Sequence, residues 1–182
     1  SRSLGVSRFI FASSSSVYGI KKALNVHEEM KLEPLTDYSK FKAECEDILL
    51  EYNSNNFTTL VIRPATVCGY SLRQRLDVIV NIFVNLAYHK RKISVFGGSQ
   101  LRPNIHIKDM AEVYDLLVTC PRSKVSAQIF NVGYENHSVL ELAHMVKNVI
   151  GDDVRLESFP TNDNRSYHIS SKKIKKILGF EP

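Results

Sequence analysis

The sequence predicts an α/β fold built on a parallel sheet, and three observations support this. Short β-branched or aromatic runs alternate with longer helical segments along the chain. The first unit is a strand, a long helix and a second strand, which right-handed crossovers place in one parallel sheet. The chain has 182 residues and 43% hydrophobic composition, enough for a core in one domain or in two small lobes.

The first unit has clear boundary signals. Residues 8–13 form a short apolar and aromatic run, which predicts a buried strand. A helix is expected over residues 36–52, because threonine and aspartate at its start can cap it and the polar run at 53–56 ends it. The β-branched run at 58–62 predicts the next strand, which Arg63-Pro64 closes.

The remaining elements follow from caps and periodicity. The capping box at 138–141 opens a helix that stops before Gly151. Ser170 or Ser171 caps a last helix, which Gly179 ends. Apolar spacing predicts further helices over 77–88 and 108–120, and strands over 93–96, 105–107, 128–132 and 154–156.

The formal net charge of +5 raises the question of nucleic-acid binding. The basic residues gather in two short runs, at 89–92 and 172–176. The first run fits the solvated end of a helix, and the second fits an amphipathic helix. No nucleic-acid-binding motif accompanies either run, so we expect no nucleic-acid partner, although an anionic small ligand could use the positive charge.

Other function classes are also disfavoured. No apolar run reaches the ~18–20 residues that cross a bilayer, and no charged-then-apolar leader opens the chain, so we expect no membrane partner. Cys45, Cys68 and Cys120 are odd in number and widely spaced, which fits reduced thiols in the cytoplasm. The six histidines form no short-spaced ligand pair, so no metal site is predicted.

A tyrosine and a lysine lie one turn apart in the helix expected at 36–52. Tyr38 and Lys42 are at i and i+4, so their side chains share a face. An ordinary tyrosine needs a pKa shift of about three units, roughly 4 kcal/mol, to act as a base near pH 7. One exposed cation supplies only ~0–1 kcal/mol. The site must therefore exclude water, and a second positive charge, such as an oxidised nicotinamide, would help.

Four serines, Ser13 to Ser16, follow the first predicted strand. Ligands of parallel sheets gather beyond the carboxyl ends of the strands. A hydroxyl there could hydrogen-bond both a substrate oxygen and the tyrosine. Each feature alone also fits a surface helix or a polar loop. The order of strand, serine cluster and helix with the tyrosine–lysine pair is more specific, and it indicates oxidation of an alcohol or reduction of a ketone.

Five motifs occur in a fixed order and cover nearly the whole chain. They are Ser13-Ser14-Ser15-Ser16-Val17-Tyr18-Gly19, Tyr38 through Lys42 with Ala43-Glu44, Arg63-Pro64-Ala65-Thr66-Val67-Cys68-Gly69, Gly98-Ser99-Gln100-Leu101-Arg102 running to Asp109, and Phe130-Asn131-Val132-Gly133. With these motifs the chain resembles the extended short-chain dehydrogenase/reductase family, and within it the NAD-dependent nucleotide-sugar epimerase/dehydratase group.

The resemblance implies the C-terminal part of a Rossmann-like doubly wound parallel sheet with a smaller α/β substrate-binding lobe. Residues 1–70 and the strand near 128–132 would form the second half of the NAD-binding domain, and 71–127 with 133–182 the nucleotide-sugar lobe. The family's glycine-rich dinucleotide loop should lie roughly a hundred residues upstream. Gly97-Gly98 lies in a hairpin context, which does not suit that loop. We therefore expect a chain truncated at both ends, which alone binds NAD weakly and turns over nothing.

The resemblance also implies residue roles. Tyr38 would be the acid/base, Lys42 would hold the nicotinamide ribose and activate the tyrosine, and Ser14 would be the catalytic hydroxyl. Arg102 would bind the nucleotide diphosphate through paired hydrogen bonds, with Arg165 as a weaker second candidate. The further contacts would be Ser13, Pro64, Ala65 and Val67 to the cofactor, with Pro64 to Val67 as a loop beside the nicotinamide, and Ser14, Ser15 and Thr66 to the substrate.

Departures from the family pattern narrow the reaction. Sugar 4,6-dehydratases of this group carry an Asp-Glu pair directly after the catalytic hydroxyl residue, where this chain has Ser15 and Ser16. The expected reaction is therefore 4-epimerisation of a nucleotide-linked sugar through a transient 4-keto intermediate. Pro103 and Asn104 replace an acidic residue and an aromatic, which leaves the lining of the sugar pocket open.

Several alternatives stay open. A keto-sugar reductase that uses NADPH would need the same residues. Another alternative keeps the fold but changes the substrate, for example to a steroid or flavonoid alcohol. A catalytically dead fragment could serve only as a binding module. The choice between NAD and NADP, the sugar and the nucleotide are not determined. The parent enzyme is expected to be a homodimer that uses the helix at 36–52 in its interface.

Overall fold

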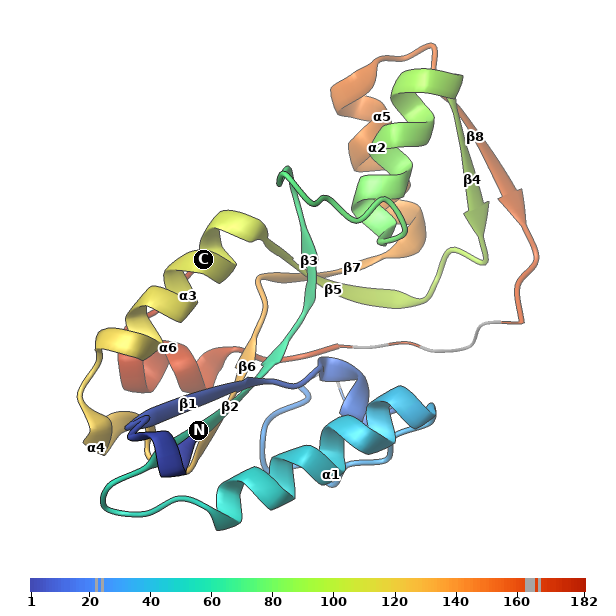
Figure 1. The fold of residues 1–182 in the computed structure, drawn as a ribbon. Helices are drawn as coiled ribbons and strands as arrows, with labels where there is room; N and C mark the ends of the chain where they lie inside the picture. The colour runs from blue at the N-terminus through green and yellow to red at the C-terminus, as the bar shows by residue number, and fades with distance from the viewer. Residues whose placement is uncertain (22, 24, 163–165, 167) are drawn as a thin grey trace.

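Three parallel strands form the first sheet of the molecule, in the order β1-β2-β6 (Figure 1). They are β1 (Arg8–Ala12), β2 (Thr58–Pro64) and β6 (Gln128–Val132). The structure is a computed structural model that describes residues 1–21, 23, 25–162, 166 and 168–182. The predicted α/β class with a parallel sheet is confirmed, and all three strands begin at the predicted residue.

The carboxyl ends of these strands lie together. Ala12 of β1 pairs with Ile62 of β2, and Ile62 pairs with Phe130 of β6. Ser13 continues the ladder, because its N–H donates to the Ile62 carbonyl at 2.8 Å. The serine cluster and the Arg63-Pro64 segment are therefore neighbours at one end of the sheet.

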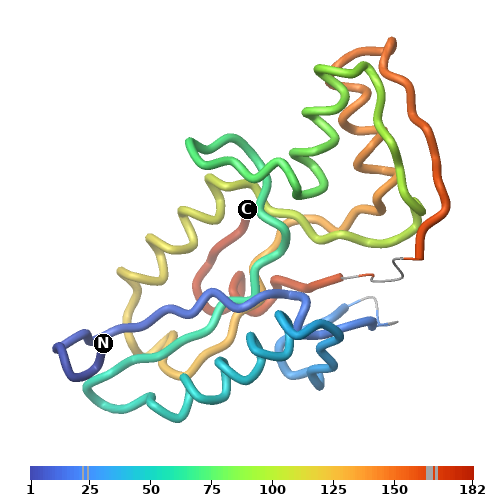
Figure 2. The backbone as a smooth tube through the Cα atoms, turned by 45° about the vertical axis from the view of Figure 1, so that its right-hand side comes forward, coloured from blue at the N-terminus to red at the C-terminus, as the bar shows by residue number. Residues whose placement is uncertain are grey.

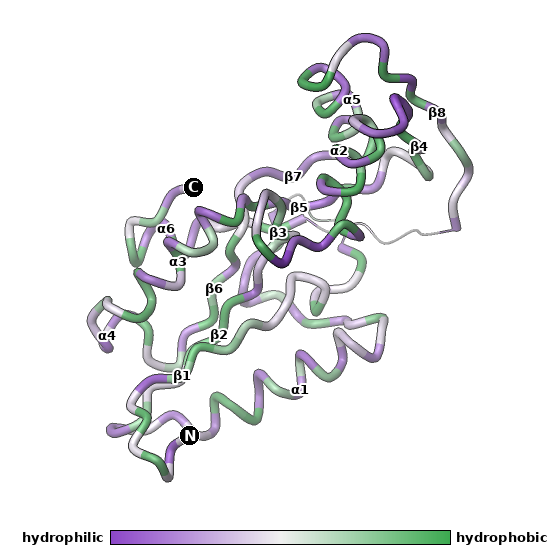
Figure 3. Tube along the Cα trace, turned by 45° about the horizontal axis from the view of Figure 1, so that its top comes forward, coloured by the Kyte–Doolittle hydropathy of each residue, from purple (hydrophilic) through white to green (hydrophobic). Residues whose placement is uncertain are grey.

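Helices cover both faces of this sheet. α1 (Asp37–Glu51) lies on one face, and α3 (Ile107–Thr119) and α6 (Lys172–Leu178) lie on the other, as Figures 1 and 2 show. β2 is buried along nearly its whole length, as expected for a strand covered on both sides. Figure 3 shows hydrophobic and hydrophilic residues alternating along α1, the pattern of an amphipathic helix.

A second sheet continues from the first. Its strands are β3 (Thr66–Cys68), β5 (Leu101–His106) and β7 (Glu135–Ser138), with β3 parallel and β7 antiparallel to β5. Ala65 alone separates β2 from β3. Gly133 follows β6, and a Cβ there would lie 3.1 Å from the Ala65 Cβ and 3.0 Å from the Ile169 Cδ1, so this tight packing favours glycine.

The third part is a parallel pair, β4 (Lys92–Phe96) and β8 (Arg155–Phe159), packed on two helices. The helices are α2 (Ile79–Lys90) and α5 (Val139–Ile150), which lie side by side in the upper part of Figure 1. Their buried core is apolar and consists of Phe83, Ala87, Ile93, Val95, Val139, Leu142, Ala143, Val146 and Val154.

The predicted helix ends are largely confirmed. Thr36 Oγ1 accepts from the Ser39 N–H at 3.2 Å, and Ser138 Oγ accepts from the Glu141 N–H at 3.1 Å in the predicted capping box. All five long helices lie within two residues of their predicted bounds. The short helices η1 (Arg2–Leu4), η2 (Ser15–Tyr18) and α4 (Arg122–Val125) were not predicted.

Two local predictions are wrong. The strand expected at 105–107 runs instead from Leu101 to His106, because pairing with β3 and β7 overrides the weak strand preference of Arg102-Pro103-Asn104. Gly97-Gly98 does not lie in a hairpin. It connects β4 to β5, which belong to two different sheets. The strand expected at 154–156 is longer at its carboxyl end.

The packing bears on the predicted domains. α3 and α6 contribute Met110, Val113, Leu117 and Ile174 to the core of the first sheet, whereas α2 and α5 form the separate apolar core. The division into a cofactor domain and a substrate lobe stays a prediction. That prediction places α3 and α6 in the substrate lobe, whereas both helices pack on the first sheet.

Candidate active site

α1 places Tyr38 and Lys42 at the carboxyl end of β1. The Lys42 ammonium donates to the Ala12 carbonyl at 2.7 Å. Its Nζ lies 4.8 Å from the centroid of the Phe11 ring and 5.6 Å from that of the Tyr38 ring. Two aromatic faces and a carbonyl thus hold the charge, and the phenol ring lies beside it, as the i and i+4 spacing predicts.

The water-excluding environment expected around Tyr38 is not formed by the described residues. The Tyr38 side chain is 59% exposed. The expectation of a dry site concerns the enzyme with its cofactor bound, so it stays a prediction. Catalysis by this tyrosine would need further groups over the ring.

The serine cluster forms a helical turn. Ser14 is the N-cap of η2, and its Oγ accepts from the Ser16 N–H at 3.2 Å and lies 2.8 Å from the Ser16 Oγ. Ser13 is 4% exposed, and its Oγ has no hydrogen-bond partner among the described residues. Ser15 is also buried. The turn ends at Gly19, where φ is +66° and a Cβ would lie 2.0 Å from the Glu33 carbonyl oxygen.

The segment from Pro64 to Val67 is not the loop that the sequence analysis expects. It is extended, and it leaves the first sheet and enters the second with a single break at Ala65. Ala65 is buried, and its N–H donates to the Val132 carbonyl at 2.7 Å. Thr66 pairs with Asn104 of β5. Ladder hydrogen bonds on both sides of the break keep this segment extended. Its predicted cofactor and substrate contacts stay predictions.

Arg102 lies within β5 and not between a turn and a strand, because β5 begins earlier than predicted. Its Nη1 donates to the Leu101 carbonyl at 3.0 Å. Arg102 lines a cavity of about 160 Å³ together with Phe96, Gln100 and Val139, and neither Tyr38, Lys42 nor Ser14 lines it. This cavity is smaller than the ~300–1,000 Å³ of typical ligand pockets. Arg165, the second candidate, lies outside the described residues.

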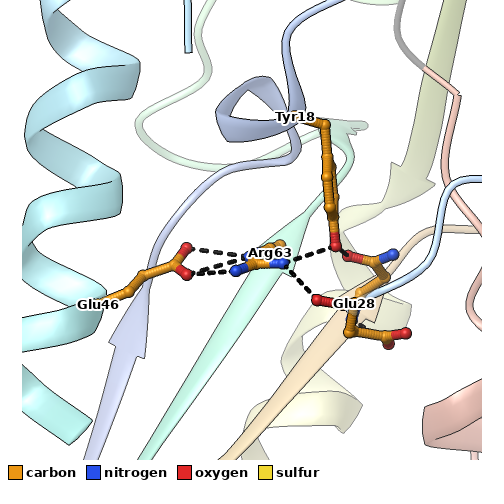
Figure 4. A network of polar contacts seen from close by, with 5 residues as sticks. Tyr18, Glu28, Glu46 and Arg63 are labelled. Carbon is orange, nitrogen blue, oxygen red and sulfur yellow. Dashed lines mark hydrogen bonds and ion pairs between the residues drawn. The ribbon is translucent and has the colours of Figure 1, made fainter. Parts of the chain in front are cut away.

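A buried polar network that was not predicted joins the motifs. Arg63 and Glu46 side chains are 3% and 1% exposed, and Arg63 Nη2 lies 2.6 Å from Glu46 Oε2 (Figure 4). Arg63 Nη1 donates to the Tyr18 hydroxyl at 2.8 Å and to the Glu28 carbonyl at 3.2 Å. The Tyr18 hydroxyl in turn donates to Asn131 Oδ1 at 2.7 Å.

The ionisation of this network follows from its surroundings. Burial raises the pKa of Tyr18 to about 12, although the charge of Arg63 opposes that shift. Burial by itself would lower the pKa of Arg63, but hydrogen bonds and charge from Glu46 and Tyr18 outweigh it and raise that pKa. At neutral pH the network therefore contains a charged guanidinium and a neutral phenol.

Two sequence signals could have revealed this network. Arg63 is a charged residue near the end of a β-branched strand that is expected to be buried, where an unpaired charge would be very costly. Glu46 continues the series of Tyr38 and Lys42 at steps of four, so it lies on the same face of α1. These signals indicate that Arg63 needs a partner and that Glu46 faces the sheet, but they do not show that the two residues pair.

A larger cavity, of about 410 Å³, lies between α2, α5 and the second sheet. Its lining is mainly apolar and contains none of the predicted site residues. Within the described ranges, no group of three or more His, Cys, Asp or Glu could hold a metal ion. Within the same ranges, every helix is too short or too polar to cross a bilayer.

Comparison with known proteins finds relatives of similar sequence. The chain is 28% identical to dTDP-D-glucose 4,6-dehydratase from Bos taurus, over 97% of its own length and 52% of the relative. It is 24% identical to UDP-glucose 4-epimerase from Lactobacillus helveticus, over 97% of its length and 59% of the relative. It thus spans a little over half the length of these curated relatives.

A solved structure has the same fold. MoeE5, in complex with UDP-glucuronic acid and NAD, is 25% identical and superposes with a TM-score of 0.84, over 98% of this chain and 60% of the other. The sequence model of one family, the NAD dependent epimerase/dehydratase family, matches residues 1–133. The chain therefore belongs to the NAD-dependent epimerase/dehydratase family.

Proposed function

We propose that the whole protein is an NAD(P)-dependent nucleotide-sugar 4-epimerase that acts through a transient 4-keto intermediate. The observation that carries this proposal is the position of Lys42, which is held on the Ala12 carbonyl beside the Tyr38 ring. Ser14 lies two residues beyond that carbonyl. The helix that carries the tyrosine and the lysine contacts the turn that Ser14 caps, which supports a joint site where ligands of parallel sheets gather.

The residues present suit the nicotinamide end of a dinucleotide. The buried Ser13 hydroxyl lacks a partner among the described residues, which leaves a hydrogen bond to be made at the end of β1. Lys42 can offer its remaining ammonium donors to a ribose. Pro64, Ala65 and Val67 would contribute apolar contacts from the neighbouring strand. NAD or NADP, when bound, supplies a reversible acceptor for the hydride of a sugar carbon.

The proton steps would belong to this chain. Tyr38 would remove the proton from the 4-hydroxyl and later return it, with the Lys42 charge stabilising the phenolate. Ser14 would hydrogen-bond the same sugar oxygen and hold it beside the phenol. Because the Tyr38 ring is 59% exposed here, the cofactor and substrate, or other parts of the whole protein, would have to exclude water.

Epimerisation is favoured over dehydration by the serines after Ser14. The elimination of water from a sugar needs an acid and a base, and the hydroxyls of Ser15 and Ser16 are poor ones. Ser15 is moreover buried, with 6% of its surface exposed. We keep Ser15 and Thr66 as proposed substrate contacts.

A nucleotide-linked sugar is the proposed substrate. Arg102 would bind its diphosphate, since a guanidinium forms paired hydrogen bonds with phosphate oxygens. The complex of MoeE5 with UDP-glucuronic acid and NAD supports this class of ligand. The cavity beside Arg102 would take only one part of such a molecule.

The test is turnover by the whole protein with UDP-, GDP-, CDP- and dTDP-sugars. We expect Tyr38→Phe to lower kcat by about 10²–10⁴-fold, because it removes the acid/base hydroxyl. Tyr88→Phe, on α2 and similarly exposed at 63%, is the matched control and should keep its activity. Normal turnover by Tyr38→Phe would contradict the proposal.

The same assay separates the alternatives. Stoichiometric oxidation of NADPH would identify a keto-sugar reductase, because an epimerase consumes no net cofactor. An Arg102→Ala variant with unchanged affinity for the nucleotide sugar would favour another alcohol as substrate. Nucleotide binding without any turnover would identify a binding module. The exposure of Tyr38 supports this alternative for the 182-residue chain on its own.

We also propose that the whole protein is a homodimer that uses α1. Phe41, Ile48 and Tyr52 form an apolar stripe on this helix and are 63%, 57% and 54% exposed. Phe41→Glu would place a charge in the interface and should convert dimer to monomer in light scattering. Val118→Glu, at an equally exposed site on α3, should leave the dimer intact. A persistent Phe41→Glu dimer would exclude this interface.

We further propose that the protein resides in the cytoplasm. Cys45, Cys68 and Cys120 are all free thiols, which supports a reducing compartment.

A further inference from the structure

The Arg63–Glu46 pair calls for an explanation other than stability. Removing two charges from water costs several kcal/mol per ion, and apolar residues of similar volume are often as stable. Both side chains are almost fully buried, and Arg63 is the one charged residue of its strand. Because burying this ion pair costs free energy, we infer that the geometry it imposes on the neighbouring segments has a functional role.

The guanidinium fixes three segments at once. On one side, Nε and Nη2 donate to the Glu46 carboxylate of α1. On the other side, Nη1 donates to the Tyr18 hydroxyl at the end of η2 and to the Glu28 carbonyl. Figure 4 shows the planar group lying between the helix and the η2 segment. Only the fixed fork of an arginine can satisfy partners on both sides in this way.

Two of these three segments, α1 and η2, carry residues of the proposed active site. Glu46 lies one turn beyond Lys42 and two turns beyond Tyr38, on the same face of α1. Tyr18 is the last residue of η2, whose N-cap is Ser14. A shift of α1 away from β2 would pull Lys42 off the Ala12 carbonyl, whereas a shift of η2 would move Ser14.

We propose that Arg63, through Glu46 and Tyr18, is a positioning residue that sets the separation between the Tyr38–Lys42 face and the Ser14 turn. It touches no reacting atom. Its effect on catalysis rests on the proposed function, but its effect on Lys42 does not. A role in stability alone predicts that an apolar replacement of the pair leaves Lys42 where it is.

The deciding measurement is NMR of the 182-residue chain. The Lys42 ammonium lies over the Phe11 ring, so its side-chain methylene protons should show ring-current shifts and contacts with that ring. In the double variant Arg63→Met/Glu46→Leu, which removes both charges and keeps the volume, we expect these shifts and contacts to be lost. Retention of both in the folded double variant would overturn the proposal.

A matched control tests for general damage to the sheet. Arg8→Met removes another arginine of this sheet, whose Nη2 donates to the Cys120 carbonyl at 2.8 Å at the opposite end of β1. The Lys42 signals should be unchanged in this variant. If the double variant fails to fold, Glu46→Gln takes its place, because it keeps the shape and one acceptor oxygen. The Lys42–Phe11 contact must then weaken, and an unchanged contact would overturn the proposal.

Kinetics of the whole protein give the second readout. We expect the double variant to lose about 10²-fold in kcat with KM little changed, since misplacement by about 1 Å can cost this much. A rise in KM alone would contradict positioning of the catalytic groups. If no form of the protein shows turnover that depends on Tyr38, the proposed function fails, and the NMR result on Lys42 still decides the inference.

Discussion

The two buried cores of this chain are built on different principles. The core between α2, α5, β4 and β8 is a cluster of aliphatic and aromatic side chains, which burial of apolar surface stabilises. The core under the candidate site contains an ion pair, a phenol and an amide among its aliphatic side chains. The apolar core requires only that its volume be filled. The polar core fixes orientations, because its hydrogen bonds break when the segments shift by a fraction of an ångström.

The location of the polar core follows from the fold. The carboxyl ends of parallel strands present polar side chains next to the site, and the nearby helix must stay in register with them. Packing of aliphatic groups tolerates sliding and repacking. A bidentate pair between α1 and β2 does not tolerate such sliding. Charge is therefore buried in the core under the candidate site, and nowhere in the described part of the second core.

The largest expected effect on stability comes from breaking the polar core on one side. Glu46→Ala leaves the Arg63 guanidinium buried without its carboxylate, which should cost about 3–5 kcal/mol. Urea denaturation of wild type and variant measures the difference. The double variant Arg63→Met/Glu46→Leu should recover most of the loss. If Glu46→Ala were as stable as the wild type, water would have to reach the Arg63 guanidinium.

The second prediction distinguishes the two cores by the pH dependence of the free energy of unfolding. Tyr18 holds its proton up to a pKa of about 12 in the folded chain, against ~10 when unfolded. Its contribution is complete below pH 10. Between pH 10 and 12 the unfolded chain loses the proton first, so stability falls, by about 2–3 kcal/mol in total.

The comparison with Tyr18→Phe isolates this contribution. The variant lacks the titrating group, so its free energy of unfolding should fall less between pH 9 and 12 than that of the wild type. Denaturation at a series of pH values measures both slopes. Equal slopes would show that Tyr18 is not buried as described.

The smallest effect should come from the apolar core. Ile93 is fully buried among aliphatic side chains, and Ile93→Val removes one methylene group there. The expected loss is about 0.5–1.5 kcal/mol, with no dependence on pH. Thermal unfolding at pH 7 and pH 9 checks both points. A pH-dependent loss would indicate a coupling between the cores that their separate packing does not provide.

Part of the site was open to prediction from sequence. The proximity of Tyr38 and Lys42 follows from helical spacing, and that of the serines to them follows from the order of strand and helix. The exposure of Tyr38 and the strand that replaces the expected loop at 64–67 were not predictable. Exposure depends on what the rest of the fold covers, and β3 forms only because β5 lies beside it.

The sequence by itself determined the parallel strands, the helices with their caps, and the spacing that puts a phenol and an ammonium on one face. These depend on local preferences and on periodicities of two and 3.6 residues. Only the tertiary structure decided that Arg63 joins Glu46 and Tyr18, which are 17 and 45 residues away along the chain. A buried charge is satisfied by whichever partners the fold brings to it, and no local signal specifies a partner at that distance.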